Sequence, residues 1–265
     1  METTRVGNVT VTRLLMGSNP FSGFSHQSAD RDREMVHYFT TAKIKEILFD
    51  AERLGITGIV ARTDHHVMRV LLEYRDDGGK MSWFAQTCPG VGPTSMCVGR
   101  AVEGGAKACH IHGGVMDNLV ATGQFDEIKR GVDEIKSYGL PAGIAGHNVR
   151  VFEWAEKNVE ADYYMCCHYN PTIRDERPEH VHGAEEKFRD EDRQAMVALA
   201  RTLRKPVIHY KIFAAGRNKA EDAFAFCGKV MRPQDMACIG VFPKDDPAMV
   251  RKDVALFEKY CGLKK

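Results

Sequence analysis

The sequence has no long apolar run, almost no net charge and no signal-like N-terminus. No apolar run approaches the roughly 20 residues of a membrane-spanning helix. A formal net charge of +1 gives no reason to expect nucleic acid or an anionic membrane surface as a partner. The opening residues, METTRVGNVTV, lack the apolar core of a signal peptide. We therefore expect a cytoplasmic protein that acts on a small molecule.

The cysteines lack the spacing of a metal or redox motif. There are eight of them, and no two form a C-x-x-C pair, which argues against a zinc ribbon or a thioredoxin-type site. Cys166 and Cys167 are adjacent, and most of the others lie in apolar segments. Buried free thiols in a reducing compartment are the expected outcome.

The chain alternates short apolar runs with amphipathic segments. The apolar runs lie at 13–17, 58–62, 82–86, 108–112, 142–146, 163–167, 206–211 and 237–242. They lack strict polar alternation, which is typical of strands buried on both faces. Helical periodicity follows, most clearly at 41–55, 125–139, 192–205 and 246–262, where Pro247 is expected in the first turn.

Eight strand–helix units in 265 residues fit a (β/α)8 barrel, an α/β fold. A doubly wound open sheet is the alternative, because the same alternation would serve it. No linker or low-complexity segment divides the chain, so one domain over 1–265 is predicted. The long polar connection at 170–188 is expected to cover the barrel mouth as a lid, with His180 and His182 exposed.

Polar residues gather where the predicted strands end, which is where barrel enzymes hold their chemistry. Four of the predicted strands end in histidine: His112, His147, His168 and His209. Burying several imidazoles in one barrel mouth is costly unless they bind a metal, a substrate or each other. We therefore expect an enzyme active site at this end of the barrel.

Three mechanisms are compatible with these residues. His112, His147 and His168 could bind one divalent ion (zinc, manganese, iron or nickel). Lys211, desolvated in the barrel, could act as a base or a Schiff-base nucleophile, or could instead pair with Asp64. Acid–base catalysis by His112 with Asp64 needs no metal.

A second set of strand-end residues offers hydrogen bonds to a small polar substrate. A sugar-like compound or a hydroxy or keto acid would suit these groups. The predicted substrate-binding residues are Asn19, Arg62, Asn148, Asn170 and Arg217.

Several segments resemble the aldo/keto reductases. VGNVTVTRLLMGSNPFSG resembles the N-terminal hairpin and first strand of that family, and the hairpin implies a plug at the bottom of the barrel. The resemblance continues in order along the chain through GITGIVARTDHH, HIHGGVMD, GHNVRVFEWA, HYNPT and YKIFAAGR. It implies an aldo/keto-reductase-like barrel.

The resemblance fails at the residues that carry the family's redox chemistry. The tetrad Asp aligns with Val60, the Tyr falls near His65, and the Lys becomes Gln86 or Thr87, so only the His survives, as His112. Asp245 and Asp246 lie where the cofactor phosphate would bind, which like charge opposes. The departures argue against NADP.

The leading prediction is a non-redox lyase, isomerase or hydrolase with a histidine-bound divalent metal. Asp64 and Lys211 are its predicted acid–base groups, and His112 is the catalytic histidine. Two alternatives stay open: an NADP-dependent oxidoreductase with a degenerate tetrad, and a barrel that binds a ligand without turnover. The sequence is also compatible with a homo-oligomer.

Overall fold

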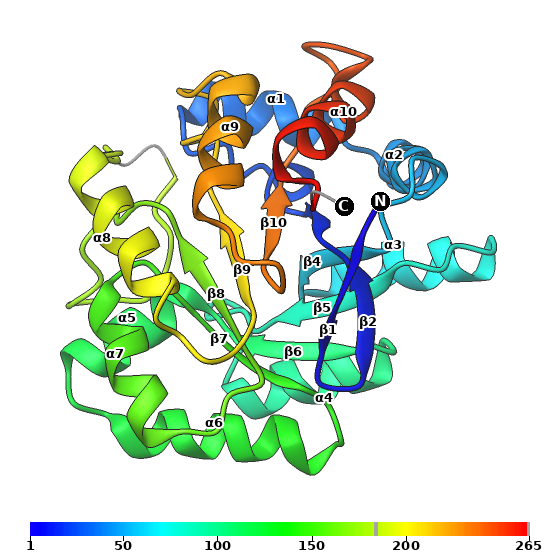
Figure 1. Cartoon of the computed structure of the whole chain (residues 1–265). Coiled ribbons are helices and arrows are strands. Elements are labelled where there is room, and N and C mark those ends of the chain that lie inside the picture. The colour runs from blue at the N-terminus through cyan, green and yellow to red at the C-terminus, as the bar shows by residue number, and fades with distance from the viewer. Residues whose placement is uncertain (183–184, 264–265) are drawn as a thin grey trace.

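The computed structural model describes residues 1–182 and 185–263. Eight parallel strands close into a barrel in the order β10-β3-β4-β5-β6-β7-β8-β9 (Figure 1). In chain order the barrel strands are β3 (Leu14–Gly17), β4 (Gly58–Arg62), β5 (Ser82–Gln86), β6 (Ala108–Ile111), β7 (Ala142–Gly146), β8 (Tyr163–Cys167), β9 (Val207–Tyr210) and β10 (Met236–Ile239). The predicted (β/α)8 barrel is confirmed, and the open doubly wound sheet is wrong.

Helices surround the barrel, and a hairpin lies at its N-terminal end. The helices are η1 (Pro20–Ser22), α1 (Ala29–Tyr38), α2 (Thr41–Arg53), α3 (His65–Asp76), α4 (Thr94–Glu103), α5 (Gly113–Ala121), α6 (Phe125–Ser137), α7 (Val149–Asn158), α8 (Asp190–Ala200), α9 (Ala220–Val230) and α10 (Met249–Cys261). Strands β1 (Thr3–Val6) and β2 (Val9–Thr12) pair antiparallel. Val6, Val9 and Val11 of this hairpin pack against the side chains that fill the barrel, as the resemblance implied.

Side chains alternate between two cores because successive residues of a strand point to opposite faces. In β8, Tyr163 and Met165 belong to the core inside the barrel, whereas Tyr164 and Cys166 belong to the core between barrel and helices. All eight cysteines are buried and free, as predicted. This alternation decides which strand-end residues reach the barrel mouth.

Two predicted helix boundaries are wrong. The helix expected over 192–205 ends at Ala200, because its last turn tightens, with Thr202 N–H donating to Leu199 O at 2.8 Å. The last helix begins at Met249, two residues after Pro247. Asp246 accepts a hydrogen bond from Ala248 N–H and holds the intervening turn outside the helix.

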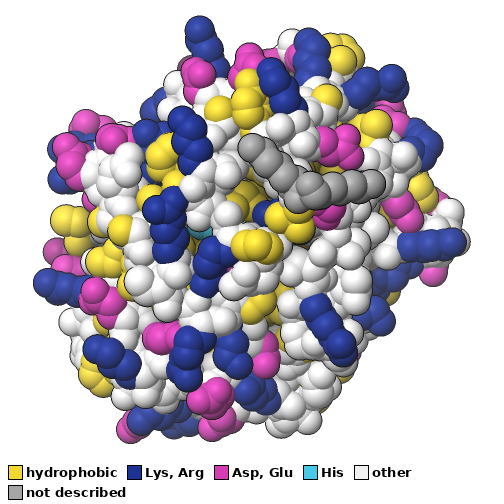
Figure 2. Space-filling model, viewed as in Figure 1, with side chains coloured by type: hydrophobic (Ala, Val, Ile, Leu, Met, Phe, Trp, Pro, Cys, Tyr) yellow, Lys and Arg dark blue, Asp and Glu magenta, His cyan; other side chains and the backbone are white. Residues whose placement is uncertain are grey.

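The surface mixes charges of both signs. Figure 2 shows Lys and Arg side chains interspersed with Asp and Glu over the viewed face, consistent with the net charge of +1. Within residues 1–182 and 185–263, no helix has both the length and the apolar character that crossing a membrane requires.

Close packing of α9 against α10 makes Gly228 intolerant of a side chain. A Cβ at Gly228 would lie 2.0 Å from the carbonyl oxygen of Tyr260. We expect Gly228→Ala to lower the free energy of unfolding by about 1–3 kcal/mol, because the two helices must separate. Gly99 in α4 is the matched control, since a Cβ there meets nothing within 4 Å. Urea unfolding should show Gly99→Ala unchanged or more stable by up to about 1 kcal/mol; equal losses in both variants would contradict the packing account.

Candidate active site

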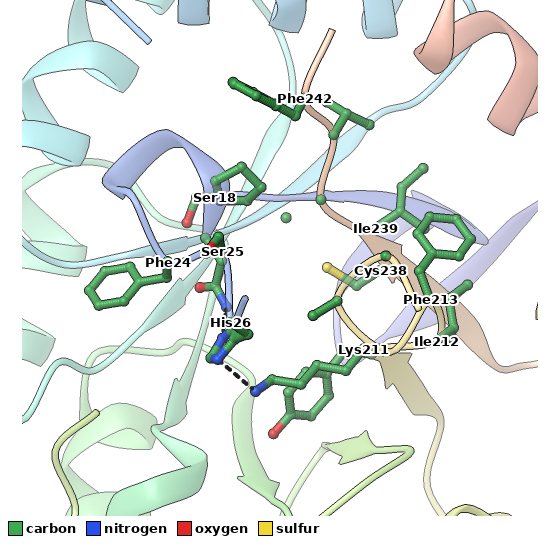
Figure 3. Close-up of a pocket in the computed structure, with 18 of the residues that line it drawn as sticks. Ser18, Phe24, Ser25, His26, Lys211, Ile212, Phe213, Cys238, Ile239 and Phe242 are labelled. Atoms are coloured by element: carbon green, nitrogen blue, oxygen red, sulfur yellow. Dashed lines mark hydrogen bonds between the residues drawn. The ribbon is translucent and has the colours of Figure 1, made fainter. Parts of the chain in front are cut away.

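Two connected cavities lie at the carboxyl ends of the barrel strands. The smaller has a volume of about 60 Å³ and is lined by Asn19, Phe24, His26, Arg62, Gln86, His112, Gly113, His147, Arg174, His180, Tyr210 and Lys211. The larger, of about 410 Å³, shares with it Asn19, Phe24, His26, Arg62, Gln86, Tyr210 and Lys211. Figure 3 shows the larger cavity, with His26 and Lys211 directed toward each other and apolar side chains such as Phe213 and Phe242 among its lining. A polar chamber therefore opens into a larger, more apolar one.

A chain of hydrogen bonds joins Asp117, His147 and Tyr210 at the wall of the smaller cavity. Asp117 in α5 accepts hydrogen bonds from the backbone N–H of His147 and of Asn148, and its Oδ2 lies 2.7 Å from His147 Nδ1. On the other side of the ring, Nε2 lies 3.2 Å from the Tyr210 hydroxyl. His147 and Tyr210 both point inward by the alternation of their strands.

This arrangement fixes the proton of the His147 ring. The Asp117 carboxylate accepts, so Nδ1 carries the proton and Nε2 can accept from the Tyr210 hydroxyl, which also lies 3.3 Å from the carbonyl oxygen of Gly146. Burial lowers the pKa of His147, and Asp117 acts against that shift. Burial also raises the pKa of Tyr210 well above its usual range, so the hydroxyl keeps its proton at neutral pH. Asp117, His147 and Tyr210 are arranged as in a catalytic triad, with the tyrosine hydroxyl in the place that the nucleophile takes there.

Lys211 enters the cavity because the backbone after β9 turns. By simple alternation Lys211 would point outward, as His209 does, but its φ of +55° is left-handed and redirects the side chain. Ala214 and Ala215 in the same connection also have positive φ. Such strain in non-glycine residues clusters at functional sites. Lys211 Nζ lies 3.4 Å from His26 Nδ1, and burial lowers the pKa of the amine.

The two histidines of the β6 segment have different roles. His110 is fully buried inside the barrel, where Nδ1 lies 3.0 Å from the Tyr163 hydroxyl and Nε2 lies 3.4 Å from Gln86 Oε1. His112 lines the smaller cavity, and its Nδ1 accepts a hydrogen bond from Gly114 N–H at 3.1 Å. A neutral ring with Nδ1 accepting carries its proton on Nε2, so His112 can donate a hydrogen bond. Burial first, and then His147, lowers its pKa well below the usual value.

Arg62 and Asn19 line the smaller cavity, whereas both carboxylate oxygens of Asp64 bind other groups of the protein. Asp64 caps α3 by accepting from Val67 N–H and pairs with Arg62 Nε at 3.0 Å. It does not pair with Lys211, and both of its oxygens have structural partners. The structure therefore gives no support to Asp64 as an acid–base group. Arg62 also stacks over Phe24, at 4.5 Å from the ring centre.

The predicted metal triad is not assembled. His112 and His147 line the cavity, but His168 faces away from it and its Nε2 lies 3.1 Å from His209 Nδ1. Alternation along β8 explains this, because Cys166 points outward, Cys167 inward and the next residue outward. Among the described residues, a different group of metal-ligating side chains comes together, formed by His26, His180 and Glu186.

Three predicted substrate-binding residues lie elsewhere. Asn148 caps α7 by accepting from Arg150 N–H, and with Asn170 it lines a separate cavity of about 480 Å³. Arg217 donates to the carbonyl oxygens of His26 and Ala214 and stacks over Phe188. Arg217 thus fastens the connections after β3 and β9 together.

Sequence reasoning missed several residues of the site. Tyr210 stood next to the predicted Lys211, and its inward position follows from the alternation of β9. Asp117 lies one helical turn into α5, where no local signal marks it. His180 was expected to be exposed, but its side chain is 15% exposed and lines the cavity, whereas His182 is half exposed. Placing residues of the 170–188 connection required the three-dimensional fold.

No family model matches the chain, and no curated protein matches it by sequence. Solved structures match almost all of it. A Pseudomonas aeruginosa protein provisionally assigned as an aldo-keto reductase aligns with a TM-score of 0.65 and 15% identity, over 97% of this chain and 95% of that one. The holo form of an aldo-keto reductase from Bacillus halodurans aligns with a TM-score of 0.60 and 14% identity, over 97% and 91%.

A different enzyme class shares the architecture. A truncated 3-deoxy-D-arabino-heptulosonate 7-phosphate synthase from Thermotoga maritima aligns with a TM-score of 0.58 and 13% identity, over 97% of this chain and 90% of that one. At such identities the likeness establishes the fold alone. The protein is an aldo-keto-reductase-like (β/α)8 barrel, an architecture that its solved neighbours use for enzymes.

Proposed function

We propose that the protein is a non-redox enzyme, a lyase or isomerase, that moves a proton on a small polar carbonyl or hydroxy compound. The observation that carries this proposal is the Asp117–His147–Tyr210 chain, which ends at the smaller cavity that Lys211 and Arg62 also line. A base and hydrogen-bond donors that converge on one polar chamber are the parts that proton abstraction beside a carbonyl requires.

In the proposed reaction the C–H bond beside the carbonyl breaks and its proton passes to the Tyr210 oxygen. The hydroxyl proton of Tyr210 moves at the same time to His147 Nε2, because burial disfavours a free tyrosinate. Asp117 stabilises the imidazolium that forms. The electron pair left on carbon becomes an enolate, whose oxygen accepts hydrogen bonds from Lys211 and Arg62.

The fate of the enolate separates the two reaction classes. In an α-hydroxy carbonyl compound, the proton of the neighbouring hydroxyl passes to the enolate oxygen and the abstracted proton returns to the former carbonyl carbon, which completes an isomerisation. Loss of a β-hydroxyl group, which leaves as water after taking the proton, completes a lyase reaction. The cavity of about 60 Å³ suits the reacting carbons and their oxygens, and the adjoining cavity of about 410 Å³ accommodates the rest of the substrate.

Deuterium exchange tests the proposal whichever product the enzyme forms. The purified protein is incubated in D2O with a panel of ketoses, aldoses and 2-hydroxy and 2-keto acids, with no nicotinamide cofactor added. Proton NMR should show loss of the signal beside the carbonyl for at least one compound. A panel without enzyme-dependent exchange, or turnover seen only after NADPH is added, would contradict the proposed function.

A further inference from the structure

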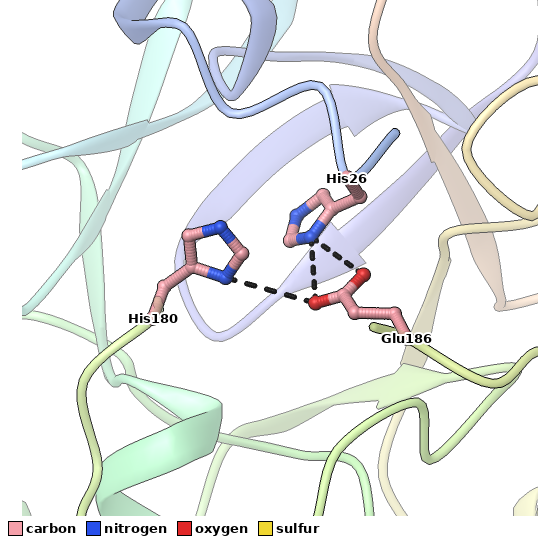
Figure 4. A group of neighbouring side chains, drawn as sticks. All are labelled: His26, His180 and Glu186. Atoms are coloured by element: carbon pink, nitrogen blue, oxygen red, sulfur yellow. Dashed lines mark hydrogen bonds and ion pairs between the residues drawn. The ribbon is translucent and has the colours of Figure 1, made fainter. Parts of the chain in front are cut away.

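His26, His180 and Glu186 form a compact group that no step of the proposed reaction uses. His26 lies in the connection after β3, and the other two lie in the connection between β8 and α8. Figure 4 shows both rings directed at the carboxylate between them. His26 Nδ1 lies 3.0 and 2.9 Å from the two Glu186 oxygens, and His180 Nδ1 lies 3.6 Å from Oε1. One donor atom from each residue lies within 4.8 Å of the others.

The group is buried and electrostatically incomplete. The Glu186 side chain is 2% exposed, and in the described part of the chain its Oε2 makes no hydrogen bond. The His26 and His180 side chains are 10% and 15% exposed. The group therefore places one carboxylate and two imidazole rings together, largely shielded from solvent.

We propose that His26, His180 and Glu186 bind one divalent transition-metal ion in the wall of the barrel mouth. Two nitrogen donors and one carboxylate form a set that zinc, and also iron, manganese or cobalt, accepts in proteins. Two ligands at about 2.1 Å from an ion can be at most about 4.2 Å apart. The observed spread, within 4.8 Å, therefore needs only a small inward movement.

The surroundings of His26 favour this arrangement. Its backbone has a φ of +57°, a strained conformation for a histidine, which is held by the Arg217 hydrogen bond to its carbonyl oxygen. The Asn19 side-chain nitrogen lies 3.4 Å from Nε2, the ring nitrogen that faces away from Glu186. When Nδ1 binds a metal, Nε2 carries the proton and donates it, so the Asn19 amide would turn its Oδ1 toward Nε2 to become the acceptor that metal-binding histidines characteristically have there. Nδ1 of His26 is then the ligand atom.

Lys211 places a positive charge beside this site. Its Nζ lies 3.4 Å from His26 Nδ1, on the cavity side. A bound ion would pair directly with Glu186 and would join the β3–α1 and β8–α8 connections across the mouth. It would also place a Lewis acid beside the proposed substrate chamber. That last role rests on the proposed function, whereas metal binding itself does not.

Metal binding by the full-length, metal-stripped protein tests the inference. Zn²⁺ is titrated by calorimetry, and Co²⁺ is followed by its visible absorption. We expect one ion per chain, and at least 100-fold weaker binding in Glu186→Gln and His26→Ala. His182→Gln is the matched control, because His182 lies in the same connection but binds Asp32 instead. Circular dichroism and thermal melting check that each variant is folded.

Three results would overturn the site: no stoichiometric ion in the wild type, wild-type affinity in folded Glu186→Gln, or loss of binding in His182→Gln. The deuterium-exchange assay, run with and without a chelator, keeps the two proposals apart. Exchange without metal binding would remove the metal site alone. Metal binding without exchange would remove the proposed function alone.

Discussion

Replacement of Tyr210 by phenylalanine should abolish most of the deuterium exchange that the proposed function predicts, while leaving the fold intact. The substitution removes only the hydroxyl, which lies 3.2 Å from His147 Nε2 at the cavity wall. Without it the proton from carbon has no carrier to His147. Loss of a positioned acid–base group costs typically about 10²–10⁴ in rate, and we expect a loss in this range. The exchange rate by NMR, on the best compound of the panel, is the measurement.

Tyr169→Phe is the control for that experiment. Tyr169 is also a buried tyrosine, and its hydroxyl accepts a hydrogen bond from Asn218 at 2.8 Å, but it does not line either of the two connected cavities. Its removal should leave exchange within a fewfold of the wild type. If Tyr210→Phe exchanges as fast as Tyr169→Phe, then Tyr210 does not carry the proton.

Asp253→Asn should stabilise the protein strongly at neutral and alkaline pH. Asp253 lies in α10, is 4% exposed and lines the larger cavity. Burial, with a smaller contribution from Asp246, raises its pKa to about 7. The folded state therefore holds a proton that the unfolded state has released above its pKa of 3.8. This difference costs about 4 kcal/mol once the pH exceeds 7, and asparagine removes the cost.

Because folding raises the pKa of Asp253, the stability gained by Asp253→Asn depends on pH. Below about pH 4 both states of the wild type are protonated, and the variant should gain nothing. Between pH 4 and 7 the wild type loses stability progressively relative to Asp253→Asn, and above pH 7 the difference is constant. Urea unfolding at pH 3.5, 5.5 and 8 measures it, with the exposed Asp133→Asn as the control. A gain that does not depend on pH would contradict burial of a protonated carboxyl group.

The barrel could be predicted from the sequence because its strands and helices carry strong local patterns. Runs such as 58–62, 82–86 and 142–146 match strands β4, β5 and β7 to the residue. His112 could be predicted to lie at the barrel mouth because it ends a strand and aligns with the histidine of the aldo/keto reductase tetrad. Local periodicity and a chain-long resemblance sufficed for these features.

His168 was wrongly predicted to point into the barrel mouth, because the residues at the ends of different strands do not all point to the same side. A strand presents alternate residues to the interior, and the parity of β8 sends His168 to the helix layer, where it meets His209. Assigning alternate residues of each strand to the interior would have excluded His168 from the predicted site and included Tyr210. Lys211 escapes this rule, because its left-handed backbone turns it back into the cavity.

The remaining site residues depend on contacts between distant segments. Glu186 lies 160 positions from His26, and Asp117 lies 30 from His147. Their segments have no repeated pattern that predicts these pairings. Their positions follow from barrel closure, which brings the connections after β3, β6, β7 and β8 to one end.

The most direct test of the proposed function asks whether His147 and Tyr210 act as one unit. The measurement is the deuterium-exchange rate of His147→Ala, Tyr210→Phe and the double variant on the same compound. If the proton passes through both residues, the double variant should lose no more activity than the more damaged single variant, because either change already interrupts the transfer. Multiplied losses in the double variant would show that the two side chains act independently and would contradict the account.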